Sequence, residues 1–219
     1  QRQMCIRDRA LVAAIAVVVS GSCLVLGSFQ GIIENAPDIA SVNVSPEGFA
    51  TKIYDSDENE IQTLSSAGAN RTYVTIDQIP KDLQHAFIAI EDERFYEHNG
   101  IDMRGILRAA SITLSSGEMS QGASTITQQL LKNNVFNAFN ESTVEKIKRK
   151  VQEQYLAIKL ETVMSKDSIL ENYLNTINLG NGYYGVQAAA RGYFNKDVSE
   201  LSISCLLYTS PSPRDYAAS

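Results

Sequence analysis

Residues 10–33 carry no charged side chain, and this uncharged stretch is the first strong pattern along the chain. The part from Ala10 to Phe29 is mostly apolar and reaches the ~20 residues with which an α-helix crosses a bilayer. We therefore predict a transmembrane anchor over residues 10–33. Two alternatives stay open, a signal peptide cleaved near Ser20 to Ser22 and a lipid-modified Cys23.

Charges on the two sides of this stretch indicate its orientation. Arg2, Arg7 and Arg9 precede it, and Glu34 and Asp38 follow it. Since basic flanks stay in the cytoplasm, we expect a single-pass protein of the cell membrane whose remaining chain is extracytoplasmic.

Both ends of the chain contain segments that differ from the rest. Met4 to Arg9 and Cys205 to Asp215 resemble translated sequencing-adapter sequence, and residue 1 is not Met. We interpret residues 1–9 as a cytoplasmic or non-native end and residues 202–219 as a non-native tail.

Beyond residue 33 the apolar pattern changes twice. Residues 34–78 predict a juxtamembrane stalk and a small β-hairpin, in which Ala50–Tyr54 and Glu60–Leu64 flank a polar turn. From residue 79 to residue 201 the apolar side chains recur at helical spacing, and no strand alternates with them. The predicted fold class is therefore mainly α.

Three of the predicted helices begin at a polar residue that can cap them, namely Asp102, Thr125 and Ser142. The polar run of residues 118–123 separates the first two helices and is expected to be flexible. The third helix spans residues 142–164 and has an apolar stripe, which is typical of a face that packs against a core. This stripe consists of Val144, Ile147, Val151, Tyr155 and Ile158.

Composition narrows the chemistry. Nineteen Lys and Arg against 25 Asp and Glu give a net charge of −6, which argues against a nucleic-acid binder with a broad basic surface. Cys5, Cys23 and Cys205 leave residues 24–204 without a disulfide framework or a thiolate metal site. His85 and His98 are the only histidines, so a His-rich zinc site is not expected. Any catalysis must rest mainly on carboxylates.

Glu91 is one candidate carboxylate. It ends a predicted helix whose apolar positions include Leu83, Phe87 and Ile90, which places it at the rim of an apolar face. Such a carboxylate suits a general base. The alternative is a solvated glutamate at a helix end.

A second candidate is a basic cluster in the helix of residues 142–164. Lys146, Lys148, Arg149 and Lys150 crowd together, and Arg149 and Lys150 share a helix face with Glu153. A solvated salt-bridged surface is one interpretation. The other is a site for a diphosphate, bound directly or through a divalent metal ion that Glu153 helps to hold.

Five short motifs, in this order, resemble those of the peptidoglycan glycosyltransferases (glycosyltransferase family 51), which form the transglycosylase module of class A penicillin-binding proteins and the monofunctional transglycosylases. They are Glu91-Asp92-x-x-Phe95-x-x-His98-x-Gly100, Gly122-x-Ser124-Thr125-Ile126-x-Gln128-Gln129, Arg149-Lys150-x-x-Glu153, Lys166-x-x-Ile169-Leu170-Glu171-x-Tyr173-Leu174-Asn175, and Tyr184-Gly185-Val186 with Tyr193-Phe194.

The resemblance implies a lysozyme-like helical domain over residues 79–201 that polymerises lipid II into β-1,4 glycan with inversion and releases undecaprenyl diphosphate. By the same resemblance, Glu91 takes the proton from the acceptor 4-hydroxyl group. Lys132, Arg149 and Lys150 compensate the charge of the departing diphosphate, and Glu153 assists by protonating it or by holding a divalent ion. The other implied substrate-binding residues are Asp92, Phe95, His98, Ser124, Thr125, Gln128, Gln129, Asn133 and Asn175.

The resemblance also implies partners and cofactors. The expected partners are lipid II, the growing lipid-linked glycan chain, the membrane and other cell-wall synthesis proteins, with no nucleic acid. No cofactor is obligatory, although Mg²⁺ or Mn²⁺ can accompany the diphosphate.

The sequence departs from the family after Leu201, where an alanine-rich helix is expected and Ser-Ile-Ser-Cys stands instead, so we predict a domain that is incomplete at its C-terminus. Neither Ser-x-x-Lys nor Lys-Thr-Gly occurs, and no transpeptidase site can be placed in these residues. Two alternative functions stay open. One is a lysozyme-like muramidase or lytic transglycosylase, and the other is a non-catalytic membrane-anchored cell-wall scaffold.

Overall fold

The computed structural model describes residues 2–49, 51–64, 71–116, 122–136 and 141–202. Most of the predicted flexible run (residues 118–121) and nearly all of the predicted non-native tail (residues 203–219) lie outside the described residues. The boundaries predicted for the domains therefore stay predictions.

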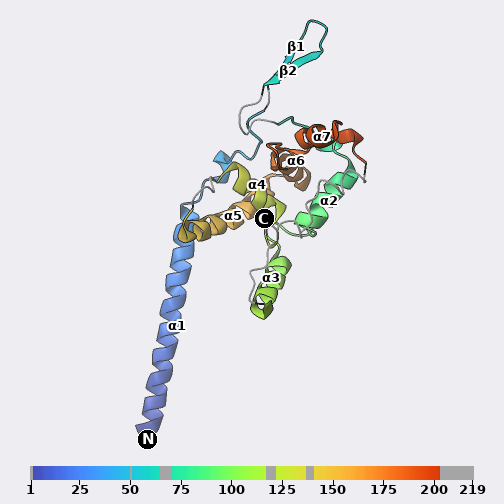
Figure 1. Cartoon of the computed structure of the whole chain (residues 1–219). Helices are drawn as coiled ribbons and strands as arrows, with labels where there is room; N and C mark the ends of the chain where they lie inside the picture. Colours follow the sequence, from blue (N-terminus) through green and yellow to red (C-terminus); the bar gives the residue numbers. More distant parts are fainter. Residues whose placement is uncertain (1, 50, 65–70, 117–121, 137–140, 203–219) are drawn as a thin grey trace.

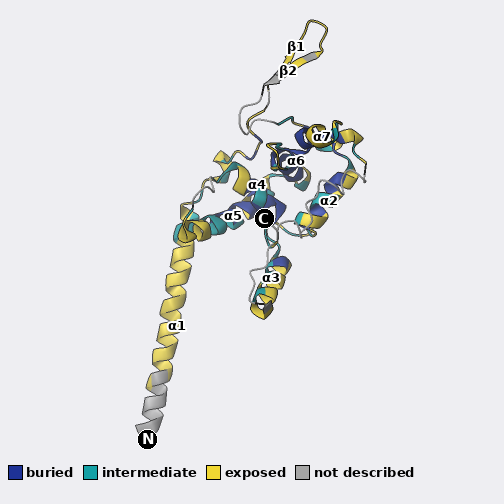
Figure 2. Cartoon of the chain, in the orientation of Figure 1, coloured by how far each residue is buried: buried dark blue, intermediate teal, exposed yellow. Residues whose placement is uncertain are grey.

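A long N-terminal helix, α1 (Arg2–Glu34), contains the predicted anchor and extends away from the rest of the molecule (Figure 1). Its apolar window has a mean hydropathy of 2.3 and none of it is buried, as the exposed length of α1 in Figure 2 shows. In the part of the chain that the structure describes, this is the one helix long and apolar enough to cross a membrane.

The predicted hairpin is present. Strands β1 (Thr51–Tyr54) and β2 (Glu60–Leu64) pair antiparallel, with Thr51 opposite Leu64 and an irregularity between Ile53 and Tyr54. The turn is built by Asp55, because its carboxylate accepts hydrogen bonds from the backbone N–H groups of residues 57 and 59.

The remaining chain is helical. Its α-helices are α2 (Lys81–Glu91), α3 (Met103–Ser116), α4 (Ile126–Asn134), α5 (Thr143–Val163), α6 (Lys166–Thr176) and α7 (Val186–Phe194). Short 3₁₀ helices lie at Ile39–Ser41, Ile76–Gln78 and Val198–Glu200. This arrangement, with the hairpin and the apolar α1, confirms the predicted mainly α fold class and is consistent with a lysozyme-like domain.

Local sequence explains where the helices begin. The side chains of Thr125, Ser142 and Ser165 each accept a hydrogen bond from a backbone N–H group in the first turn of α4, α5 and α6. At Ser142 the bond is reciprocal, because Glu145 reaches back to the backbone of Ser142 and completes the predicted capping box.

The core lies where α4 packs between α5 and α6. Leu130 and Leu131 of α4, Leu156 of α5, and Leu170 and Tyr173 of α6 are fully buried. Burying each such side chain contributes about 1.5–3 kcal/mol. Figure 2 shows this dark-blue centre, in contrast to the largely exposed α3.

The predicted stripe of α5 is wrong for three of its five residues, whereas Tyr155 packs against the core and Val151 is partly buried. Val144, Ile147 and Ile158 are 75%, 58% and 44% exposed, whereas the buried face of α5 carries Gln152, Glu153, Leu156, Ala157 and Leu160. The periodicity of apolar residues did not identify the buried face because two of its residues are polar. Gln152 donates to the carbonyl oxygen of Ile32 on α1, and Glu153 accepts from Arg149 and Lys150 of α5 itself.

Candidate active site

A cavity of about 350 Å³ opens between the end of α2, one side of α4 and the first half of α5. A carboxylate stands on one wall and a cation-rich helix face on the other. The lining residues are Ile90, Glu91, Gly122, Ser124, Gln128, Gln129, Lys132, Asn133, Arg149, Lys150 and Glu153.

Glu91 is the last residue of α2 and is partly buried, not fully solvated. Its Oε2 atom accepts a hydrogen bond of 2.8 Å from Nε2 of Gln129, which lies on the first turns of α4. Pairing to another helix holds the carboxylate at the cavity wall, as a general base requires.

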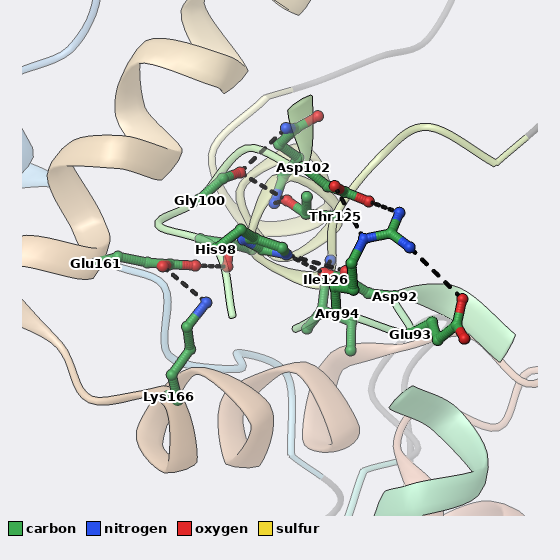
Figure 3. A network of polar contacts seen from close by, with 12 residues as sticks. Asp92, Glu93, Arg94, His98, Gly100, Asp102, Thr125, Ile126, Glu161 and Lys166 are labelled. Carbon is green, nitrogen blue, oxygen red and sulfur yellow. Dashed lines mark hydrogen bonds and ion pairs between the residues drawn. The ribbon is translucent and has the colours of Figure 1, made fainter. Parts of the chain in front are cut away.

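The residues behind Glu91 fix the path of the chain that leaves α2 (Figure 3). The buried carboxylate of Asp92 lies 2.9 Å from Nε2 of His98 and accepts a 3.0 Å hydrogen bond from the backbone N–H of Ile126. Thr125 and Gln128 both donate to the carbonyl oxygen of Gly100, at 2.8 and 3.1 Å. These bonds join the end of α2 to the start of α4.

Gly100 is required for this close approach. Its φ is +82°, and a Cβ atom there would lie 2.5 Å from the carbonyl carbon of Ala157 on α5. Phe95 of the same loop is fully buried beneath the ammonium group of Lys166, which lies 4.4 Å from the ring centre. The loop of residues 92–102 is thus packed against α4, α5 and α6.

The opposite wall is a network around Glu153. Its carboxylate is fully buried and accepts hydrogen bonds from Arg149 and, at 2.9 Å, from Lys150. Lys150 also donates to Ser124 at 2.9 Å, which ties α5 to the segment before α4. The burial of Glu153 argues against the interpretation of this cluster as a solvated salt-bridged surface.

Arg149 has a second carboxylate partner. Its Nε atom lies 2.9 Å from both carboxylate oxygens of Glu141. Burial lowers the pKa of Arg149, but the hydrogen bonds to Glu141 and the charge of Glu153 outweigh it, so that the pKa lies above its ordinary value and the cation is permanent. Sequence reasoning missed Glu141, because it precedes α5 and no helical spacing relates it to Arg149.

A second cavity of about 230 Å³ also has Glu91 in its wall. It shares Ile90, Glu91, Gly122 and Ser124 with the first cavity, and its own wall is polar, with Arg94 paired to Asp102 and with Arg108. Glu91 therefore lies where the two cavities meet.

The structure brings nine of the predicted site residues to the first cavity, namely Glu91, Ser124, Gln128, Gln129, Lys132, Asn133, Arg149, Lys150 and Glu153. Asp92, Phe95, His98 and Thr125 support it from behind. Asn175 is not part of it, because its buried amide pairs with the backbone N–H and carbonyl groups of Val74.

The residues present do not fit a metal ion held by the protein. No group of three or more His, Cys, Asp or Glu side chains suited to a metal occurs among the described residues. Both oxygens of Glu153 already accept hydrogen bonds from cations. The cationic side chains that line this cavity are Lys132, Arg149 and Lys150.

A carboxylate that faces fixed cations across a cavity of a helical domain is an arrangement suited to acid–base chemistry beside an anionic group. The transglycosylase family matches residues 57–218, and the chain belongs to this family.

Curated relatives agree with this assignment. The chain is 43% identical over 194 residues to penicillin-binding protein 1A of Escherichia coli (strain K12), and the aligned region covers 89% of this chain and 22% of that protein. It is 44% identical over 182 residues to penicillin-binding protein 1A of Clostridium novyi (strain NT), covering 81% and 21%. Over 155 residues it is 44% identical to penicillin-binding protein 1F of Bacillus subtilis (strain 168), covering 71% and 21%. The chain spans about a fifth of the length of these relatives.

Proposed function

We propose that this chain is a peptidoglycan glycosyltransferase that polymerises lipid II into β-1,4 glycan strands and releases undecaprenyl diphosphate. The observation that carries the proposal is the placement of Glu91 opposite Arg149, Lys150 and Glu153 across one cavity. A base on one wall and cations on the other match the two demands of the reaction, a deprotonated acceptor and a stabilised anionic leaving group.

The reaction is a single displacement with inversion at the donor carbon. Glu91 removes the proton from the 4-hydroxyl group of the N-acetylglucosamine of lipid II, and the oxygen attacks C1 of the terminal N-acetylmuramic acid of the growing chain. The bond from C1 to the diphosphate oxygen breaks as the new bond forms. The position of Glu91 between the two cavities supports this role, because one cavity can hold the donor and the other the acceptor.

The first cavity suits the donor diphosphate. Arg149 and Lys150 are held in place by Glu153, and Lys132 lines the same space without a hydrogen bond or ion pair to any described residue. Fixed cations stabilise developing negative charge without reorganisation. Glu153 keeps Arg149 and Lys150 oriented. Binding of an Mg²⁺ or Mn²⁺ ion by the diphosphate of the substrate stays a prediction, and comparing the activity with and without EDTA tests it.

The membrane completes the proposal, because the substrate carries a lipid. The apolar α1 acts as a single-pass anchor with the domain on the extracytoplasmic side. Helix α3 projects from the domain toward the same side as α1 (Figure 1) and exposes Leu107 and Leu114 by 66% and 88%. Both features support a site that faces the bilayer surface.

Product analysis tests the function. Purified protein reconstituted with lipid II is expected to form long glycan and free undecaprenyl diphosphate. The rival muramidase would instead release short fragments from finished sacculi, and that result would overturn the proposal. The cations of the first cavity favour the synthase, since hydrolysis of a neutral glycosidic bond releases no anionic leaving group.

A further inference from the structure

We propose that Tyr173 and Gln129 form a hydrogen-bonded relay that holds the carboxylate of Glu91 in position, so that Tyr173 is a positioning residue for the reaction. The inference rests on the proposed function of Glu91 as the base. It gives Gln129 a role toward the base in addition to the contact with substrate that the family resemblance implies.

Three helices supply the members of this relay. Glu91 ends α2, Gln129 lies on α4 and Tyr173 lies on α6. Nε2 of Gln129 donates to Oε2 of Glu91 at 2.8 Å, and the hydroxyl group of Tyr173 donates to Oε1 of Gln129 at 3.3 Å. The two ends of one amide are thus held by the base on one side and by the tyrosine on the other.

Tyr173 is well suited to hold the amide. Its side chain is fully buried, and its ring packs edge-on against Phe87 of α2 with 6.4 Å between the ring centres. Tyr173 does not line either cavity around Glu91, so it acts through Gln129 and not on the substrate.

The direction of the hydrogen bonds determines the chemistry. An amide N–H group pointing at a carboxylate stabilises the ionised form, which is the form that accepts a proton. An amide rotated by 180° would point its oxygen at Glu91 and would stabilise the protonated form instead. The hydroxyl group of Tyr173 opposes this rotation because it donates to the amide oxygen.

Other charged groups also face Glu91. Lys132 of α4 and Arg149, Lys150 and Glu153 of α5 line the first cavity. The second cavity presents Asp92, Glu93 and Arg94 after α2, with Asp102 before α3 and Arg108 on it. All of these remain in a variant that lacks the tyrosine hydroxyl group, so they are common to the variant and the parent.

The test is Tyr173→Phe in the full chain, assayed with lipid II. We expect kcat to fall roughly threefold to tenfold, as expected for one lost hydrogen bond, while KM for lipid II stays unchanged. Gln129→Met should also lower kcat, and the double variant should lower it no further than Gln129→Met alone.

Tyr73→Phe is the matched control. The hydroxyl group of Tyr73 donates a hydrogen bond to the carboxylate of Glu171, so Tyr73→Phe also removes one tyrosine hydrogen bond. Tyr73 lines neither cavity. Its kcat should equal that of the parent. A Tyr173→Phe enzyme with the kcat of the parent or with a changed KM, or a double variant that loses more than Gln129→Met alone, would overturn the relay. Failure of the proposed function is distinguishable, because the parent protein itself would then form no glycan.

Discussion

Gln152 donates a hydrogen bond of 3.0 Å from its Nε2 atom to the backbone carbonyl oxygen of Ile32. Ile32 lies in the last turn of α1, where carbonyl groups have no partner within the helix. Gln152 is buried and directly precedes Glu153 on α5. The apolar helix is therefore joined to the helix that carries the cations of the site.

Gln152→Leu should loosen this junction. The variant keeps the side-chain bulk but leaves the carbonyl oxygen of Ile32 without its partner, and we expect the free energy of unfolding to fall by about 1 kcal/mol. Thermal unfolding in detergent measures the change. Gln154→Leu on the same helix is the control and should leave the unfolding midpoint nearly unchanged, and equal effects of both would contradict the assignment.

Glu91→Gln should abolish most of the polymerisation while the protein stays folded. A general base contributes about 10²–10⁴-fold to a rate, and glutamine cannot accept the proton. The measurement is glycan formation from lipid II, with circular dichroism to check folding. Glu97→Gln, at an exposed side chain of the following loop that lines neither cavity, should behave like the parent. A Glu91→Gln protein with full biological function would favour the non-catalytic scaffold.

Lys150→Met should impair use of the donor more than it impairs folding. Loss of one preorganised charge at the leaving group costs about 10²-fold in rate. The effect on folding is smaller, because Lys150 is half-exposed and its removal leaves Arg149 paired with the buried Glu153. Steady-state rates with lipid II and a thermal melt separate the two effects. Lys146→Met, at an exposed position of the same helix, should reduce the rate much less.

The pair of Asp102 and Arg94 predicts a loss of stability in acid. The hydrogen bond from Arg94 holds the pKa of Asp102 below its ordinary value of 3.8. Because the folded-state pKa lies below the unfolded one, the stabilisation is present above about pH 4 and is lost as the pH falls through the folded-state pKa.

Melting temperatures of the parent and of Asp102→Asn measure this effect between pH 7 and pH 3. The difference between the two proteins should be largest near neutral pH and should shrink in acid. Asp57→Asn, in the exposed hairpin turn, should show no comparable trend. A difference that is constant with pH would exclude the ionised pair as its source.

Gly100→Ala should destabilise the loop that follows Glu91. The positive φ of Gly100 costs about 1–3 kcal/mol for a residue with a side chain, and the clash with Ala157 adds to it. Gly122→Ala is the control for strain alone, because φ is +105° there but no atom lies within 4 Å of the added Cβ. Chemical unfolding should show the larger loss for Gly100→Ala.

Local signals in the sequence predicted much of the fold. The polar residues that cap α4 and α5 act within a single helical turn, and their effect does not depend on the rest of the chain. The spacing of Arg149, Lys150 and Glu153 likewise places three charges on one helix face. The uncharged stretch of residues 10–33 forms part of a long helix for the same local reason.

The tertiary structure decided the roles that depend on distant partners. Glu153 is buried because α5 turns a partly polar face toward α4, and no periodicity along α5 predicted this. Asn175 pairs with Val74, 101 residues away, and the hydroxyl group of Tyr173 is linked to Glu91 through the amide of Gln129.

The sequence by itself thus determined which residues are helical and which charges neighbour one another along a helix, because these follow from bonds and contacts within a few residues. Only the tertiary structure decided which of those charges are desolvated and what each one faces, because desolvation depends on the packing of segments that lie far apart in the chain.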